Sequence, residues 1–323
     1  MYRHHTVAVV LPAYNEAGHV GDVIASLPSF VDRMYVVDDA STDGTWDEIR
    51  EQAAALNGES AGGDDRDRDQ DRDRVVPLRH DVNRGAGGAL KTGYRRALAD
   101  GLELVATMDA DGQMDPDELD RLLDPLVEGR ADYAKGDRLS RPADRGAMPR
   151  FRLVGNAALT LLTRIASGYW RTSDPQNGYT AITREALAAV DVEELFEYYG
   201  YCNEMLVRLN AAGLCVADVP MSANYGDEES HISLTAYVPK VAFILLCGFL
   251  WRYRRKYLAD GVHPVGAYCI AGVVAGFLGV LSILLGFGSV AFGATLLALA
   301  VGELATAMSL DRTESRPLEV TIE

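Results

Sequence analysis

The stretch "LELVATMDADGQ", from Leu102 to Gln113, decides the fold, because an apolar run is followed at once by acids. Its first half has the length and composition of a buried strand. Asp109 and Asp111 then follow one residue apart, and Gln113 offers a further oxygen. Carboxylates crowded at one strand end repel each other unless a cation lies among them, so the stretch predicts a site for Mg²⁺ or Mn²⁺. A plain turn before an Asp-Pro helix start would explain Asp115 but not the two acids before it.

On both sides of this stretch, β-branched runs alternate with helical patterns from Thr6 to about Asp137. This succession predicts an α/β fold, with a mainly parallel sheet and helices on both of its faces. The expected strands are 6–12, 33–39, 74–80, 102–109 and 132–137, and the expected helices are 17–27, 45–56, 88–101 and 116–129.

The strand ends of this predicted sheet are unusually acidic. Glu16 follows the first strand, and Asp38 and Asp39 end the second. In open α/β sheets, ligands bind outside the carboxyl ends of the strands, where these acids and the Asp109 pair would meet. A divalent ion among them would bridge naturally to a diphosphate.

The stretch "NRGAGGALKTGY", from Asn83 to Tyr94, is neither a Walker A loop nor a dinucleotide fingerprint. Lys91 does not directly follow a glycine, and Leu90 stands in place of the third glycine. The glycines are expected to let backbone pass close to a ligand or to start a helix. Lys91 remains either a phosphate contact or a solvated helix residue.

The chain has 323 residues, 48% of them hydrophobic, and a formal net charge of −16. This acidity argues against nucleic acid as a partner, because phosphate backbones are held by clustered cations. The biased tract 58–74 contributes little of the charge and is expected to be a flexible acidic loop. The acidic excess is therefore spread over the surface, which suits a high-salt cytoplasm.

The C-terminal part is apolar enough to enter a membrane. Residues 265–287 carry no charge over about 23 positions, and a second apolar run covers 290–308. These two runs predict two transmembrane helices. The basic and aromatic stretch 251–257 precedes them, so the positive-inside rule predicts that the domain before them is cytoplasmic. A buried hairpin of a soluble protein is the alternative. Residues 234–258 are expected to lie in the interface as an amphipathic region, and 309–323 to form a cytoplasmic tail.

The motifs, taken in order, resemble those of family 2 glycosyltransferases of the GT-A fold, and within them the polyprenyl-phosphate sugar transferases related to dolichol-phosphate mannose synthase. The resemblance covers about 6–258, with residues 1–233 as the GT-A catalytic domain. It is carried by "LPAYNE" (11–16), "VVDDASTDGT" (36–45), "NRGAGGAL" (83–90), "MDADGQ" (108–113), "KGDRLS" (135–140), "MPRFRLVGN" (148–156), "SDPQNGYTAITREAL" (173–187), "YCNEML" (201–206) and "YGDEESHIS" (225–233).

The resemblance implies roles for individual residues. The nucleotide-sugar pocket would be formed by Pro12, Tyr14, Glu16, Val37, Asp39, Asp109, Ala110 and Asp111, with Asp39 accepting a hydrogen bond from the base. The metal would be held by Asp109, Asp111 and Gln113. Arg138 and Arg152 would bind the acceptor phosphate, and these two arginines with Asp109 and Asp111 would carry catalysis.

Four further positions are less settled. Asp174 and Glu204 stand where members of the family keep acids, although either is equally explained as a helix cap or structural partner. Asn224 stands where the family commonly has a basic residue, and His231 where a cation is often seen. Whether that loop closes over the donor diphosphate is therefore open, unless His231 or Lys240 substitutes.

The implied reaction transfers a hexose from a UDP- or GDP-hexose to a polyprenyl or dolichyl phosphate in the membrane lipid, in a single inverting step. A polyprenyl phosphate oxygen is already ionised near neutral pH, so cations matter more than a general base. A phosphotransferase, a processive polysaccharide synthase and a non-catalytic nucleotide-sugar-binding membrane module are the alternatives. The sequence leaves a homo-oligomer open.

Overall fold

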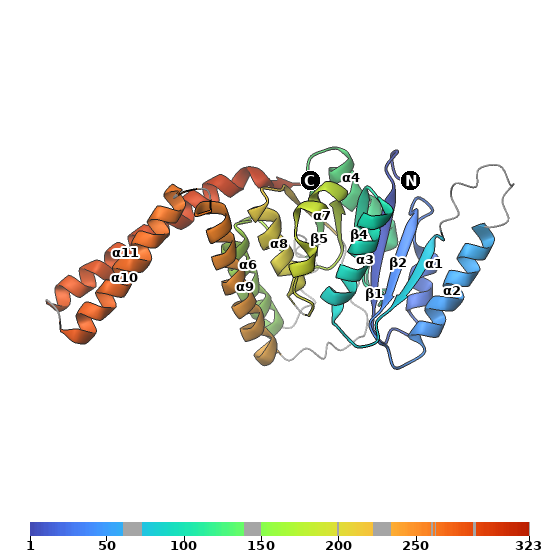
Figure 1. The fold of residues 1–323 in the computed structure, drawn as a ribbon, viewed down its shortest axis with the longest axis horizontal. Helices are drawn as coiled ribbons and strands as arrows, with labels where there is room; N and C mark the ends of the chain where they lie inside the picture. Colours follow the sequence, from blue (N-terminus) through green and yellow to red (C-terminus); the bar gives the residue numbers. More distant parts are fainter. Residues whose placement is uncertain are drawn as a thin grey trace.

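The computed structural model describes residues 1–60, 73–138, 150–198, 200–221, 234–259, 261, 263–286 and 289–322. They form an α/β domain built on one sheet, from which a long helical hairpin projects (Figure 1). Most of the predicted acidic loop 58–74 lies outside the described residues. Its first three residues, 58–60, instead continue helix α2.

The sheet has eight strands in the order β3-β2-β1-β4-β6-β5-β7-β8. All neighbouring strands run parallel except β6, which is antiparallel to both β4 and β5. The prediction of a mainly parallel sheet is therefore confirmed. The strands are β1 Val7–Ala13, β2 Arg33–Asp38, β3 Val75–Arg79, β4 Leu104–Thr107, β5 Tyr133–Asp137, β6 Thr180–Thr183, β7 Val216–Pro220 and β8 Glu319–Thr321.

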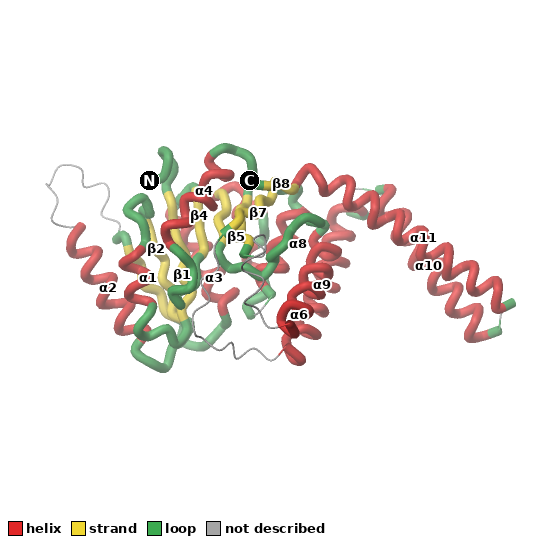
Figure 2. The backbone as a smooth tube through the Cα atoms, turned by 180° about the vertical axis from the view of Figure 1, so that it is seen from behind, coloured by secondary structure: helices red, strands yellow, loops and turns green. Residues whose placement is uncertain are grey.

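Helices cover both faces of the sheet because the strands are apolar on both sides (Figure 2). In β1, Val7, Val9 and Leu11 pack with α1, α2 and α4, whereas Ala8 and Val10 pack with α3, α7 and α8. The helices of the domain are α1 Val20–Ser26, α2 Thr45–Ser60, α3 Ala86–Asp100, α4 Leu119–Val127, α6 Arg150–Ser167, α7 Arg184–Ala189, α8 Tyr201–Ala211 and α9 Leu234–Tyr257, with 3₁₀ turns η1 Pro116–Glu118, η2 Val192–Glu194 and η3 Arg316–Leu318.

The projecting hairpin consists of α10 Pro264–Leu285 and α11 Val290–Ser315. Both helices are long and apolar enough to cross a membrane. They pack closely through glycines, since a Cβ on Gly279 would lie 3.1 Å from the carbonyl oxygen of Gly293. Their outer faces have no protein cover: Phe277 is 67% exposed and Leu284 is 75% exposed. This exposure argues against the alternative of a buried soluble hairpin.

The chain beyond the hairpin returns to the sheet, where the sequence suggested only a tail. Helix α11 continues to Ser315, and β8 then pairs in parallel with β7. A buried ion pair between Arg252 of α9 and Asp311 of α11, 2.8 Å apart, holds the end of α11 against α9. The hydroxyl of Tyr257 donates to Asp311 at 2.6 Å. The hairpin is therefore joined to the α/β domain on both of its sides.

Candidate active site

A cavity of about 530 Å³ opens at the carboxyl ends of β1, β2 and β4. The parallel topology brings these ends together, as expected for an open α/β sheet. Of the predicted site residues, the cavity is lined by Pro12, Tyr14, Glu16, Asp39, Asp109, Ala110 and Asp111. Val37 is fully buried inside β2, and neither it nor Gln113 lines the cavity.

Asp109 and Asp111 lie at the end of β4. Burial raises the pKa of Asp109 to about 6, the negative charge of Asp111 adds to this rise, and Arg138 opposes it. The side chain is enclosed by protein atoms, yet the carboxylate faces the cavity and so keeps partial access to solvent. Two carboxylates this close repel each other when both are charged, and a bound cation would relieve that repulsion.

The turn after β4 orients this pair of acids. Asp111 Oδ1 accepts a hydrogen bond from the backbone N–H of Gln113 at 2.9 Å, and Gly112 between them has a φ of 76°. This left-handed conformation suits glycine and closes a short Asx turn. Gly178, two residues before β6, approaches this pair: a Cβ there would lie 3.3 Å from Asp109 Oδ2.

The oxygen-rich end of β4 fits a hard divalent ion. Carboxylate and amide oxygens from Asp109, Asp111 and Gln113 are the ligand type that Mg²⁺ and Mn²⁺ prefer. Among the residues that the structure describes, no three or more His, Cys, Asp or Glu side chains are grouped to form a complete metal cage. Such an ion would therefore need further oxygens from a bound phosphate group or from water, as magnesium sites beside phosphates usually do.

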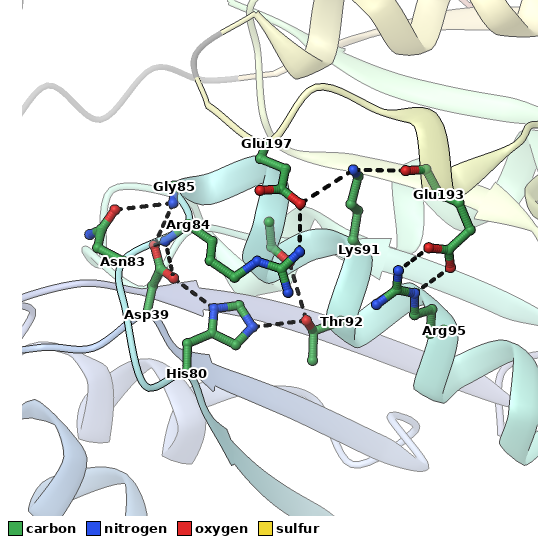
Figure 3. Close-up of polar contacts among 11 residues, drawn as sticks. Asp39, His80, Asn83, Arg84, Gly85, Lys91, Thr92, Arg95, Glu193 and Glu197 are labelled. Carbon is green, nitrogen blue, oxygen red and sulfur yellow. Dashed lines mark hydrogen bonds and ion pairs between the residues drawn. The ribbon is translucent and has the colours of Figure 1, made fainter.

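Asp39 holds the loop that follows β3 (Figure 3). Its carboxylate accepts from the backbone N–H groups of Arg84 at 2.9 Å and Gly85 at 2.7 Å. The ring of His80 contributes a third bond, 2.7 Å from Nδ1 to Oδ1. Asp39 thus shapes the cavity wall, and any hydrogen bond to a base would use its remaining acceptor capacity. Its neighbour Asp38 is fully buried and pairs with Arg79 at 2.9 Å.

The glycines of 83–90 leave room for a second backbone segment to approach closely, and that segment belongs to the same chain. A Cβ on Gly87 would lie 2.2 Å from the carbonyl oxygen of Phe196, and Gly88 N–H donates to Glu197 O at 2.9 Å. This contact places Tyr198 on the cavity wall. The glycine pattern was the only sequence signal for it, and it did not reveal which segment would approach.

Lys91 is neither solvated nor directed at the cavity. It is 5% exposed, and its Nζ donates to the carbonyl oxygen of Glu193 at 2.9 Å while facing Glu197 (Figure 3). The cavity is also lined by Asn83, Gly85, Ala86 and Ala89, which belong to the glycine-rich stretch 83–94, and by Ala13 and Tyr198, which the sequence did not single out.

Arg138 follows β5 and lies close enough to Asp109 to lower the pKa of that carboxyl. Its Nε donates to Asp174 Oδ2 at 2.8 Å, and its side chain is 37% exposed. Burial alone would raise the pKa of Asp174, but Arg138 and Lys135 outweigh burial and hold it below its usual value. Asp174 is therefore a charged partner of Arg138.

The remaining predicted positions divide into two groups. Glu204 is a structural partner, because it accepts from the backbone N–H of Phe196 at 2.6 Å and from Arg208 at 3.0 Å. Arg152 falls in the first turns of α6, but its side chain, like all of Asn224 and His231, lies outside the described residues.

A second, apolar cavity of about 460 Å³ lies between α8 and α9. Its lining includes Phe196, Lys240 and Trp251, and Tyr198, two residues after Phe196, lines the first cavity. The short segment from Phe196 to Tyr198 therefore contributes to the walls of both cavities.

Curated relatives cover most of this domain. The chain is 31% identical over 220 residues to UDP-N-acetylglucosamine–dolichyl-phosphate N-acetylglucosaminyltransferase of Methanococcus voltae, covering 68% of this chain and 86% of the relative. It is 32% identical to polyprenol monophosphomannose synthase of Mycolicibacterium smegmatis, covering 66% and 76%.

Solved structures share the fold. Glucosyl-3-phosphoglycerate synthase of Mycobacterium tuberculosis, in complex with Mn²⁺, uridine diphosphate and glucosyl-3-phosphoglycerate, superposes with a TM-score of 0.54 at 20% identity, covering 77% of this chain and 80% of that one. The model of glycosyl transferase family 2 matches residues 8–190, more than half of the chain. The chain therefore belongs to glycosyl transferase family 2, has the GT-A fold, and is a glycosyltransferase.

Proposed function

We propose that this enzyme transfers a hexose from a UDP- or GDP-hexose to a polyprenyl or dolichyl phosphate, with inversion and with the help of Mg²⁺ or Mn²⁺. One observation carries the proposal. The acid pair Asp109 and Asp111 lies at the end of β4 in the cavity, and the cation Arg138 lies close enough to influence Asp109 electrostatically. Acids for a metal-bound diphosphate and a cation for an anionic acceptor are the two things that this reaction requires.

On the donor side, the nucleoside would occupy the cavity between Tyr14 and the loop that Asp39 holds. The diphosphate would then extend toward Asp111. A divalent ion bound by Asp109, Asp111 and Gln113 would act as a Lewis acid on the departing diphosphate. Both Asp109 and Asp111 line the cavity, which supports this placement.

On the acceptor side, the nucleophile would be an ionised phosphate oxygen, so the protein needs only to bind and orient it. Arg138, already oriented by Asp174, is suited to this task, with Arg152 as its proposed partner. The names of two relatives above include dolichyl-phosphate or polyprenol, and this supports a lipid phosphate as the acceptor.

The membrane would lie against the hairpin and against the apolar outer side of α9. On that helix Phe243 is 66% exposed and Leu250 is 58% exposed. Arg254, Arg255 and Lys256 end the helix, so a cytoplasmic location of the catalytic domain satisfies the positive-inside rule. This orientation would bring the domain to the lipid phosphate at the membrane surface.

The direct test incubates the purified chain in detergent with labelled UDP- and GDP-hexoses, undecaprenyl or dolichyl phosphate, and Mg²⁺ or Mn²⁺. The label is expected in the extracted lipid from one nucleotide class, and α-linked donors should give β-linked products. Asp111→Asn should abolish transfer, whereas Asp117→Asn, at an exposed acid of the same region, should not. Transfer that continues in EDTA, or donor hydrolysis without lipid product, would contradict the proposal.

A further inference from the structure

The short segment Arg171–Asp174, between α6 and β6, carries the acid that orients Arg138. Asp174 accepts from Arg138 Nε at 2.8 Å through its side chain. Its backbone carbonyl accepts from the ammonium group of Lys135 at 2.9 Å. The position of Arg138 therefore depends on where this segment lies.

Polar contacts fix the first three residues of the segment as well. The N–H of Arg171 donates to Glu319 Oε1 at 2.6 Å, and the N–H of Ser173 donates to Asp218 Oδ2 at 2.9 Å. The carbonyl oxygen of Thr172 accepts from Arg164 Nε at 2.7 Å. Each of the four residues is thus held by at least one side chain from elsewhere in the chain.

Buried Lys135 and half-buried Asp218 form an ion pair beneath the segment. Their strands β5 and β7 are adjacent, with the two residues in register, and the charged atoms lie 3.0 Å apart. Lys135 is 1% exposed. A lysine so deeply buried needs all its partners, so its contacts to Asp218 and to the Asp174 carbonyl are fixed in geometry.

The outermost contact comes from the far end of the chain. Glu319 begins β8, which pairs with β7 so that Glu319 is in register with Val216. It follows α11 by a single 3₁₀ turn, and α11 is itself anchored by the buried Arg252–Asp311 pair. A residue just beyond the second apolar helix therefore touches the segment that orients Arg138.

We propose that Glu319, Asp218 and Lys135 are positioning residues for the acceptor-phosphate site. They hold Arg171–Asp174 so that Asp174 orients Arg138 near Asp109, and Glu319 makes this arrangement depend on the docked end of the membrane hairpin. The inference rests on the proposed role of Arg138 in binding a lipid phosphate. It adds that the hairpin helps to assemble the site, beyond anchoring the enzyme.

Replacing Glu319 should weaken the use of the lipid-phosphate acceptor and leave binding of the nucleotide donor unchanged. Glu319 and Arg171 do not line the nucleotide cavity, so uridine or guanosine nucleotide affinity should not depend on them. Losing one hydrogen bond that orients the segment should raise the KM for the lipid phosphate by about fivefold. The glutamine variant keeps a carbonyl oxygen for the Arg171 N–H and should restore most of the loss.

The experiment compares Glu319→Ala, Glu319→Gln and Glu314→Ala in the full-length chain. Glu314 lies on the same C-terminal stretch but faces His263, so its replacement is a matched control. The measurements are KM for undecaprenyl phosphate, kcat, and nucleotide affinity by calorimetry. Each Glu319 variant is also made in the Arg138→Ala background, because residues that act through Arg138 should lose their effect once Arg138 is absent.

Support consists of a higher acceptor KM in Glu319→Ala, its recovery in Glu319→Gln, unchanged nucleotide affinity, and no further effect in the Arg138→Ala background. An equal effect in that background overturns the inference, as does a parallel loss of nucleotide affinity or an unchanged KM in Glu319→Ala. If Arg138→Ala alone leaves the acceptor KM unchanged, the proposed role of Arg138 fails, and the inference fails with it. If Arg138→Ala raises it but Glu319→Ala does not, only the inference fails.

Discussion

Replacing Asp109 by asparagine should stabilise the metal-free enzyme at neutral pH, although it should abolish activity. Burial and the charge of Asp111 raise the pKa of Asp109 from its usual 3.8 to about 6. A rise of this size is equivalent to about 3 kcal/mol of penalty on the charged form. Because the carboxylate faces the cavity, water relieves part of it, and we expect Asp109→Asn to gain about 1–2 kcal/mol.

The pH dependence has a defined sign. A carboxyl with a higher pKa in the folded state binds more protons there than in the unfolded chain between about pH 4 and pH 6. The stability of the metal-free wild type should therefore fall as the pH rises through this window, and the penalty is fully present above it. Asp109→Asn should lack this component, so the two proteins should converge near pH 4 and differ most above pH 6.

The assay is thermal unfolding in detergent, followed by tryptophan fluorescence, with Asp117→Asn as the control. At pH 7.5 in EDTA, the midpoint of Asp109→Asn should exceed that of the wild type by about 2–4 °C. Adding Mn²⁺ and a nucleotide should raise the wild-type midpoint but not that of the variant. A lower midpoint for Asp109→Asn in EDTA, or parallel pH profiles, would refute the reasoning.

Three further predictions follow from packing. Gly87→Ala should push the cavity wall outward and weaken nucleotide binding in a calorimetric titration, because its Cβ would lie 2.2 Å from a backbone carbonyl. The control Gly58→Ala, whose Cβ would have no atom within 4 Å, should leave nucleotide binding unchanged. Asp311→Asn should destabilise the protein by about 3 kcal/mol in urea unfolding, because it leaves the guanidinium of Arg252 buried without its anionic partner; an unchanged midpoint would contradict this. Deleting 257–323 should also destabilise the catalytic domain, since it removes β8 and Asp311. A truncated domain with the wild-type unfolding midpoint would contradict this.

The first half of the domain could be predicted from the sequence because its signals are local. Each parallel strand from β1 to β4 is a short apolar run. The acids of the site closely follow β1, β2 and β4 in the chain. The predicted strand 102–109 was longer than the observed β4, which ends at Thr107, before Asp109. The gathering of Glu16, Asp39 and Asp109 around one cavity followed from the topology alone.

The second half depends on contacts between distant residues, which leave little local pattern. Strand β8 has only three residues, and nothing in them indicates pairing with β7 about a hundred residues earlier. The buried state of Lys91 depends on the backbone of Glu193, which no spacing reveals. The hydrogen bonds of Asp39 to the loop at Gly85 were hidden for the same reason.

The central claim is that the acids at the end of β4 hold a divalent ion that joins them to the diphosphate of the donor. Calorimetric titration of the intact chain with UDP and GDP, in Mn²⁺ and in EDTA, tests it most directly. We predict that one of the two nucleotides binds in Mn²⁺, that EDTA weakens this binding at least tenfold, and that Asp111→Asn does the same. Equal affinity with and without the ion, or no binding of either nucleotide, would contradict the claim.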